Sequence, residues 1–191
     1  RKLNNLMLSK DIKFKNFKKQ KIDIFLKKKF LSIFKDIKIK RNQIMISMSK
    51  KYKDSYSQKI IKKLRHIKMI TLIGMGGSVL GAKAIYSFCK SSKKKFSFIE
   101  NFSSSNLENL KNNLFLIISK SGSTLETISN QNIFNHNNAK KIFITDNKDS
   151  YLRTLATKSK SEIINHNNLI GGRYSVFSEV GMFPAQLMGL N

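Results

Sequence analysis

The chain has 191 residues, with 37 Lys and Arg against 11 Asp and Glu, so its net charge is +26 at pH 7. Such a charge attracts phosphate, but residues 1–70 hold 23 of the basic side chains, and no aromatic-basic interleaving or recognised nucleic-acid motif accompanies them. No run approaches the roughly 18 to 20 apolar residues that span a bilayer. We therefore expect neither nucleic acid nor a membrane as a partner.

The start of the chain, RKLNNLMLSK, lacks the compact apolar block of a signal peptide. A single cysteine, Cys89, cannot form an internal disulfide. Both observations favour a cytoplasmic location. The three histidines are far apart in sequence, so we expect no metal site.

The first 66 residues have the pattern of a helical N-terminal segment. Apolar residues recur at steps of mostly three and four over residues 22–37, with lysines between them, which predicts an amphipathic helix. Tyr52, Tyr56, Ile60 and Leu64 repeat the four-residue step and predict a second helix. We expect residues 1–66 to form this segment and residues 67–191 to form one domain.

From residue 69 onward, short apolar runs alternate with helical stretches. The expected strands are Met69–Ile73, Phe96–Ile99, Leu114–Ile118, Lys141–Thr145 and Ile163–Ile164. The expected helices lie near residues 78–90, 105–112, 123–134 and 149–158. This alternation predicts an α/β fold with three αβα layers around a parallel five-stranded sheet. Ligands of such sheets bind beyond the carboxyl ends of the strands, at helix N-termini.

A glycine-rich loop, GMGGSVLG at Gly74–Gly81, directly follows the first expected strand. Its glycines allow a close backbone approach, and Ser78 can cap the next helix or donate to a bound oxygen. The spacing does not give the GxGxxG of a dinucleotide loop, because Val79 stands where the third glycine would fall. A plain tight turn between strand and helix remains the alternative.

A second loop, SKSGSTLET at Ser119–Thr127, combines five hydroxyl side chains with a glycine at the expected start of a helix. Hydroxyls and unpaired backbone amides together suit a phosphate monoester. The alternative is a capping box made by Ser123 and Glu126. Capping leaves Ser119, Ser121 and Thr124 without a role, so we favour phosphate binding.

A third segment, NLIGGRYSVFSEVGMFP, places Arg173 behind two glycines and ahead of an expected buried helix. A fixed cation at the mouth of a fold suits an anionic substrate or an oxyanion. The alternative is a loop arginine that pairs with a surface carboxylate.

Together, GMGGSVLG, IISKSGSTLET and GGRYSVFSEVG resemble the phosphoglucose isomerase family, whose domains are of the sugar isomerase (SIS) type. The resemblance covers roughly residues 50–191, and GGRYSVFS is its most specific part. It implies an aldose-ketose isomerase of glycolysis and gluconeogenesis that interconverts glucose 6-phosphate and fructose 6-phosphate through an enediolate, without metal or cofactor. It also implies a homodimer for the complete protein.

The resemblance assigns roles to individual residues. It implies a phosphate cradle of Ser119, Lys120, Ser121 and Thr124, with Gly77 and Ser78 beside the sugar. It also implies that Arg173, with the Gly172 amide, stabilises the enediolate. This last role agrees with the fixed cation expected from the residues themselves.

The chain departs from the family pattern at Glu179, where the family has a small residue. Glu126 and Glu179 are the acids close to the motifs, neither matches the family's base, and we expect a helix-cap or surface role for both. The family takes its base, its ring-opening histidine and a further lysine from later sequence. We therefore expect an N-terminal fragment with the first of two SIS domains, itself inactive. A sugar-phosphate-sensing SIS regulatory module is the alternative, but it leaves GGRYSVFS unexplained.

Overall fold

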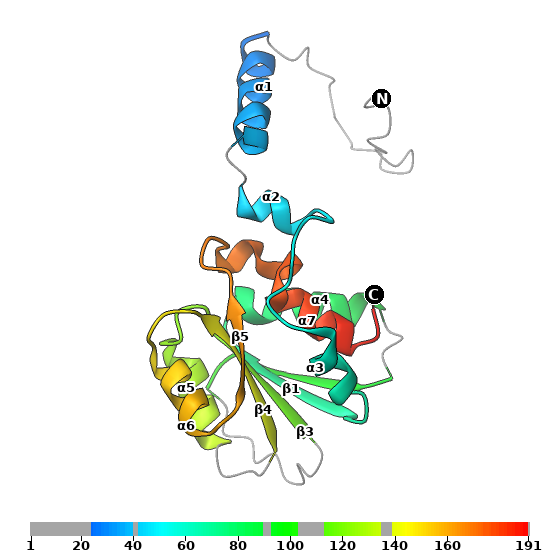
Figure 1. Ribbon diagram of the computed structural model, residues 1–191, viewed down its shortest axis with the longest axis vertical. Coiled ribbons are helices and arrows are strands. Elements are labelled where there is room, and N and C mark those ends of the chain that lie inside the picture. The colour runs from blue at the N-terminus through cyan, green and yellow to red at the C-terminus, as the bar shows by residue number, and fades with distance from the viewer. Residues whose placement is uncertain (1–23, 40–41, 90–92, 103–112, 135–138, 191) are drawn as a thin grey trace, which may run out of the picture. The chain divides into compact units, whose positions relative to one another are not determined.

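The computed structural model describes residues 24–39, 42–89, 93–102, 113–134 and 139–190 (Figure 1). Two compact units divide at Lys40 and Arg41. The described part of the first unit is helix α1 (Ile24–Ile39), which confirms the helix predicted over residues 22–37. The second unit contains everything from Arg41 onward.

The second unit is built on a parallel five-stranded sheet, as predicted. Its strands are β1 (Met69–Gly74), β2 (Lys95–Ile99), β3 (Asn113–Ile118), β4 (Lys140–Asp146) and β5 (Glu162–His166), in the order β2-β1-β3-β4-β5. Each observed strand contains the apolar run that predicted it and extends beyond it by one to three residues. All four strand pairs are parallel, so the carboxyl ends of the five strands meet at one edge.

Helices cover both faces of the sheet (Figure 1). One face carries α3 (Gln58–Lys63), α4 (Gly77–Cys89) and α7 (Glu179–Leu187), and the other carries α5 (Leu125–Ile133) and α6 (Tyr151–Lys158). A short helix, α2 (Gln43–Ser47), precedes α3, and a 3-10 helix, η1 (Gly172–Phe177), precedes α7. The predicted three-layer αβα architecture is confirmed. None of the described helices is both long and apolar enough to cross a membrane.

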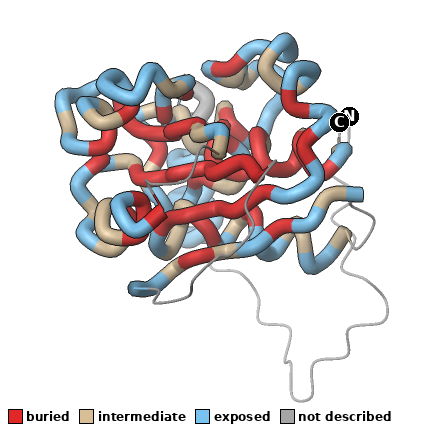
Figure 2. Tube along the Cα trace, turned by 90° about the horizontal axis from the view of Figure 1, so that it is seen from below, coloured by how far each residue is buried: buried red, intermediate tan, exposed pale blue. Residues whose placement is uncertain are grey.

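Alternate residues of the strands supply two separate cores. In β3, Leu114, Leu116 and Ile118 face the layer of α4 and α7, whereas Phe115 and Ile117 face the layer of α5 and α6. Figure 2 shows the resulting pattern, with buried strands inside and exposed helix surfaces outside. Because the strands are apolar on both sides, their sequences are near-continuous apolar runs.

Two expectations differ from the structure. The helix predicted from Tyr52 to Leu64 forms only over Gln58–Lys63. The chain before Gln58 is non-helical, and this conformation places Tyr56 in the core, edge-to-face on Phe183. The unit that holds the sheet begins at Arg41, before the boundary expected at residue 67. Leu64, which precedes the expected boundary, already belongs to the core of this unit. The helix expected over residues 105–112 lies outside the described residues.

Candidate functional site

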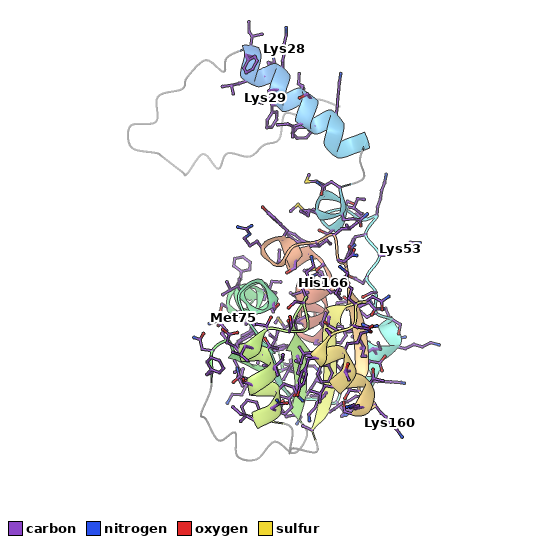
Figure 3. The ribbon with its side chains drawn as sticks, turned by 90° about the vertical axis from the view of Figure 1, so that its left-hand side faces the viewer. Lys28, Lys29, Lys53, Met75, Lys160 and His166 are labelled. Carbon is purple, nitrogen blue, oxygen red and sulfur yellow. The ribbon has the colours of Figure 1, made fainter. Side chains whose placement is uncertain are left out.

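The loops after β1 and β3 lie side by side at the carboxyl edge of the sheet. Gly74, the last residue of β1, pairs with Ile118, the last residue of β3. The sheet order reverses between these strands, since β2 lies beyond β1 while β4 and β5 lie beyond β3. Open α/β sheets bind ligands at such a reversal. In Figure 3, Met75 after β1 and His166 in β5 mark this edge, opposite Lys160.

Four predicted site residues line one pocket at this edge: Ser78, Lys120, Ser121 and Thr124. Its volume is about 460 Å³. The remaining lining residues are Asp146, Lys148 and Asp149, which follow or end β4. These three residues were not predicted from the sequence, although their position after an expected strand was a usable signal. Ser78 lies in the first turn of α4, which begins at Gly77, so it is not the residue that caps the helix.

The loop after β3 is held together by its own hydroxyls. The Oγ of Ser119 lies 2.9 Å from the Oγ1 of Thr124 and accepts the backbone N–H of Gly122 at 3.2 Å. Gly122 has φ +65°, a left-handed conformation that favours glycine. Ser119 is only 2 % exposed, so its visible role is to shape the loop.

The capping box considered as an alternative for this loop does not form. Thr124 occupies the N-cap position of α5, and its side chain makes no capping hydrogen bond there. The hydroxyls of Ser121 and Thr124 therefore remain at the pocket, beside the first amides of the helix. Hydroxyl donors next to a helix N-terminus suit a phosphate group.

The loop that carries Arg173 packs tightly against two helices. A Cβ added at Gly77, the first residue of α4, would lie 2.2 Å from the carbonyl oxygen of Gly172. A Cβ at Gly181 in α7 would lie 2.0 Å from the carbonyl oxygen of Val176. The Oγ of Ser175 donates to the carbonyl oxygens of Gly172 and Gly77, at 2.7 and 3.2 Å. The structure thus gives Gly77 a packing role against the arginine loop.

Arg173 itself is exposed on η1. Among the described residues no carboxylate forms an ion pair with its guanidinium. A direct link joins the two functional loops, because the ammonium of Lys120 donates to the carbonyl oxygen of Asn168 at 2.7 Å. Lys120 lines the pocket, so Asn168 contacts a residue of the pocket wall, whereas Arg173, Gly77 and Gly172 are not among the lining residues.

Glu179 corrects the expectation of a surface or capping role. It is 1 % exposed, and its Oε1 lies 2.9 Å from the Nδ1 of His166 and accepts the backbone N–H of Asn167 at 2.6 Å. Its Oε2 accepts the hydroxyl of Tyr52 at 2.7 Å. Burial alone would raise the pKa of this carboxyl, but the hydrogen bonds from His166, Tyr52 and backbone amides outweigh it, and the pKa is lowered.

No group of three or more His, Cys, Asp and Glu side chains is placed to hold a metal ion in the described ranges. The chemistry available at this edge is therefore that of two lysines, two aspartates, several hydroxyls and one exposed guanidinium. Such a set can bind an anionic group and stabilise a developing negative charge beside it.

Comparison with known proteins identifies relatives of this chain. The family model of phosphoglucose isomerase matches residues 32–190. A glucose-6-phosphate isomerase of Methanocaldococcus jannaschii is 33% identical over 143 residues, and one of Campylobacter jejuni is 35% identical over 152 residues, which cover 68 and 71% of this chain. The aligned regions span only 35 and 37% of the lengths of those two relatives.

A solved structure with a similar fold is the sugar isomerase domain of an RpiR transcription factor from Sphaerobacter thermophilus. Its TM-score is 0.55 and its identity 14%, and the match covers 83% of this chain and 87% of that domain. The likeness establishes the SIS-type fold that the sequence predicted.

Proposed function

The chain belongs to the phosphoglucose isomerase family, and we propose that the protein carrying it interconverts glucose 6-phosphate and fructose 6-phosphate. In this proposal the enzyme acts in the cytoplasm, in glycolysis and gluconeogenesis, as a homodimer. The observation that carries it is the pocket in which Ser78, Lys120, Ser121 and Thr124 meet beside the arginine loop.

We assign the phosphate of the sugar to this pocket. The hydroxyls of Ser121 and Thr124 and the amides at the start of α5 would donate to its oxygens, and Lys120 and Lys148 would supply positive charge. Ser119 would act indirectly, by fixing the position of Thr124 through their hydrogen bond.

We assign to Arg173 the negative charge that develops when a proton moves between C1 and C2. An enediolate carries this charge only in and near the transition state, and a cation held in place beforehand stabilises it without reorganisation. The exposed guanidinium, which has no ion-pair partner among the described residues, is available for this role. The Gly172 amide would assist it, and Gly77 would keep the loop close to α4.

Steady-state kinetics in the fructose 6-phosphate to glucose 6-phosphate direction tests this assignment. Arg173→Ala should lower kcat by about 10² to 10³, the scale for losing one oxyanion-stabilising group, while KM changes only a few-fold. Arg173→Lys should restore part of the rate, because an ammonium keeps the charge but lacks the planar fork. A large rise in KM with kcat intact would make Arg173 a phosphate ligand instead.

The regulatory SIS module remains the second candidate from the sequence, and the likeness to the RpiR domain supports only a shared fold. A sensor needs the phosphate pocket but has no need of a second cation held beside it for a transition state. Sugar-phosphate binding without any turnover by the protein that carries this chain would favour the sensor.

A further inference from the structure

The loop that carries Arg173 begins and ends at the same buried carboxylate. His166 closes β5 and Asn167 opens the loop, while Glu179 stands at its far end as the first residue of α7. The Oε1 of Glu179 contacts both His166 Nδ1, at 2.9 Å, and Asn167 N, at 2.6 Å. One side chain therefore joins the two ends of the loop, with Arg173 midway between them.

From this geometry we propose that Glu179 is a positioning residue that fixes the Arg173 loop for the isomerisation. The inference rests on the proposed function, since it concerns the guanidinium assigned to the enediolate. Glu179 does not face the substrate pocket. It acts through the loop that it closes.

The other backbone hydrogen bonds within the loop are too local to join its two ends. They run from Ile170 N to Asn167 O, from Tyr174 N to Gly171 O and from Ser178 N to Ser175 O, each across three residues. Such bonds form turns, but they leave the ends of the segment free to separate. Three side-chain bonds tether the loop to other parts of the chain: Lys120 donates to the carbonyl oxygen of Asn168, Asn167 donates to the side chain of Gln43, and Ser175 donates to the carbonyl oxygen of Gly77. None of them joins one end of the loop to the other, as Glu179 does.

The two oxygens of Glu179 have different partners, which makes the proposal testable. Oε1 joins the ends of the loop, whereas Oε2 accepts a bond from Tyr52, which lies outside the loop and before α3. The Tyr52 hydroxyl also interacts with the side chain of Asn167. Its loss should weaken the fold but leave both Oε1 contacts, and therefore the closed loop, in place. Loss of the carboxylate charge should weaken the fold and also loosen the loop.

The experiment compares Glu179→Gln with Tyr52→Phe in the protein that carries this chain. We expect Glu179→Gln to lower kcat by about 10- to 100-fold with KM nearly unchanged, because misplacing a catalytic group by about 1 Å costs up to about 10². Tyr52→Phe should keep kcat within about twofold, while its melting temperature falls. Glu162→Gln, the same substitution at the exposed start of β5, is the matched control and should change neither quantity. Equal effects of Glu179→Gln and Tyr52→Phe on kcat would overturn the proposal.

A double substitution separates this proposal from the proposed function. If Glu179 acts through the guanidinium, Glu179→Gln should cost little further rate in an Arg173→Ala background. Additive losses would mean that Glu179 acts by another route. If Arg173→Ala leaves kcat unchanged, the assigned function of the arginine fails, while the state of the loop remains measurable without activity.

Hydrogen exchange supplies that second measurement. Amides of residues 168–178 should exchange faster in Glu179→Gln than in wild type, and those of β3 should not change. Should Glu179→Gln fail to fold, His166→Leu gives a second test, since it removes one of the two contacts of Oε1 at the start of the loop and leaves the Asn167 bond, so it should accelerate exchange in the loop to a smaller extent. Unchanged exchange in the loop of a folded variant would overturn the proposal.

Discussion

The two functional loops of this domain are built in opposite ways. The phosphate loop after β3 is short, and its hydroxyls bind within six residues of sequence, where Ser119 contacts Gly122 and Thr124. Backbone bonds also tie this loop to the neighbouring β4 and α6. The arginine loop depends on partners far away in the chain. Its backbone rests on Gly77, and its end is fixed by Glu179, which also binds Tyr52.

This difference predicts which kinetic parameter substitutions at each loop should change. The hydroxyls of the phosphate loop line the pocket themselves, so their substitution should act mainly on binding. A loop organised by long-range packing can be displaced by substitutions that touch no substrate. Changes around the arginine loop should therefore lower kcat, whereas changes in the phosphate loop should lower affinity.

The largest expected effect comes from Gly77→Ala. Its Cβ would lie 2.2 Å from the carbonyl oxygen of Gly172, and that atom is backbone, so the arginine loop must move away. A displacement of about 1 Å can reduce a rate by about 10², so we expect kcat to fall by about 10² or more. KM should change far less, because the phosphate loop is untouched.

The control for Gly77→Ala is Gly171→Ala, in the arginine loop itself. There the nearest atom to an added Cβ is a ring carbon of Tyr174, at an ordinary 3.8 Å. This variant should keep kcat within a few-fold of wild type. If both alanines slow the reaction equally, contact with Gly172 is not what places the arginine.

The second effect is expected from Ser121→Ala combined with Thr124→Ala. Each hydroxyl can give one hydrogen bond to a charged phosphate, and such a bond contributes about 1.5 kcal/mol or more. Because the pocket is open to water, we expect a loss of affinity for sugar phosphate of about 10- to 100-fold. Titration followed by chemical shifts of the loop amides measures it, and persistence of phosphate-dependent shifts in the double variant would place the cradle elsewhere.

The sequence predicted the sheet well because its strands are buried on both faces. Runs such as Leu114–Ile118 are apolar without interruption, as expected for a strand with a helix layer on each side. It predicted the N-terminal helices less well. The spacing from Tyr52 to Leu64 suits a helix, but the burial of Tyr56 against Phe183, a tertiary contact, determines the conformation there.

The same distinction between local motifs and tertiary contacts applies to the candidate site. The residues proposed to bind phosphate were suggested by hydroxyls, a glycine and a helix start within one short motif, and the structure brings Lys120, Ser121 and Thr124 to one pocket. The role of Glu179 could not be found in this way, since its partners Tyr52 and His166 are far from it in sequence. Only the departure of Glu179 from the family pattern signalled that this position is unusual.

The smallest expected effect concerns pH and tests how the arginine loop is anchored. The pKa of Glu179 is raised by burial but lowered overall by its hydrogen bonds, below its ordinary value of 4.5. A carboxyl whose pKa is lowered in the folded state stabilises the protein above its unfolded pKa, and this contribution is lost as the pH falls through the folded pKa.

We therefore expect wild type to lose free energy of unfolding below about pH 4.5 more steeply than Glu179→Gln, which has no proton to gain at this position. A single group can contribute at most about 1.4 kcal/mol per pH unit, so the two slopes should differ by no more than this. Urea unfolding at several pH values between 3 and 6 measures both slopes. Glu162→Gln, at an exposed position, should keep the wild-type slope. If Glu179→Gln keeps the wild-type slope as well, the carboxylate is not bound as the structure has it, and the anchoring of the arginine loop must come from its packing on α4 and α7 alone.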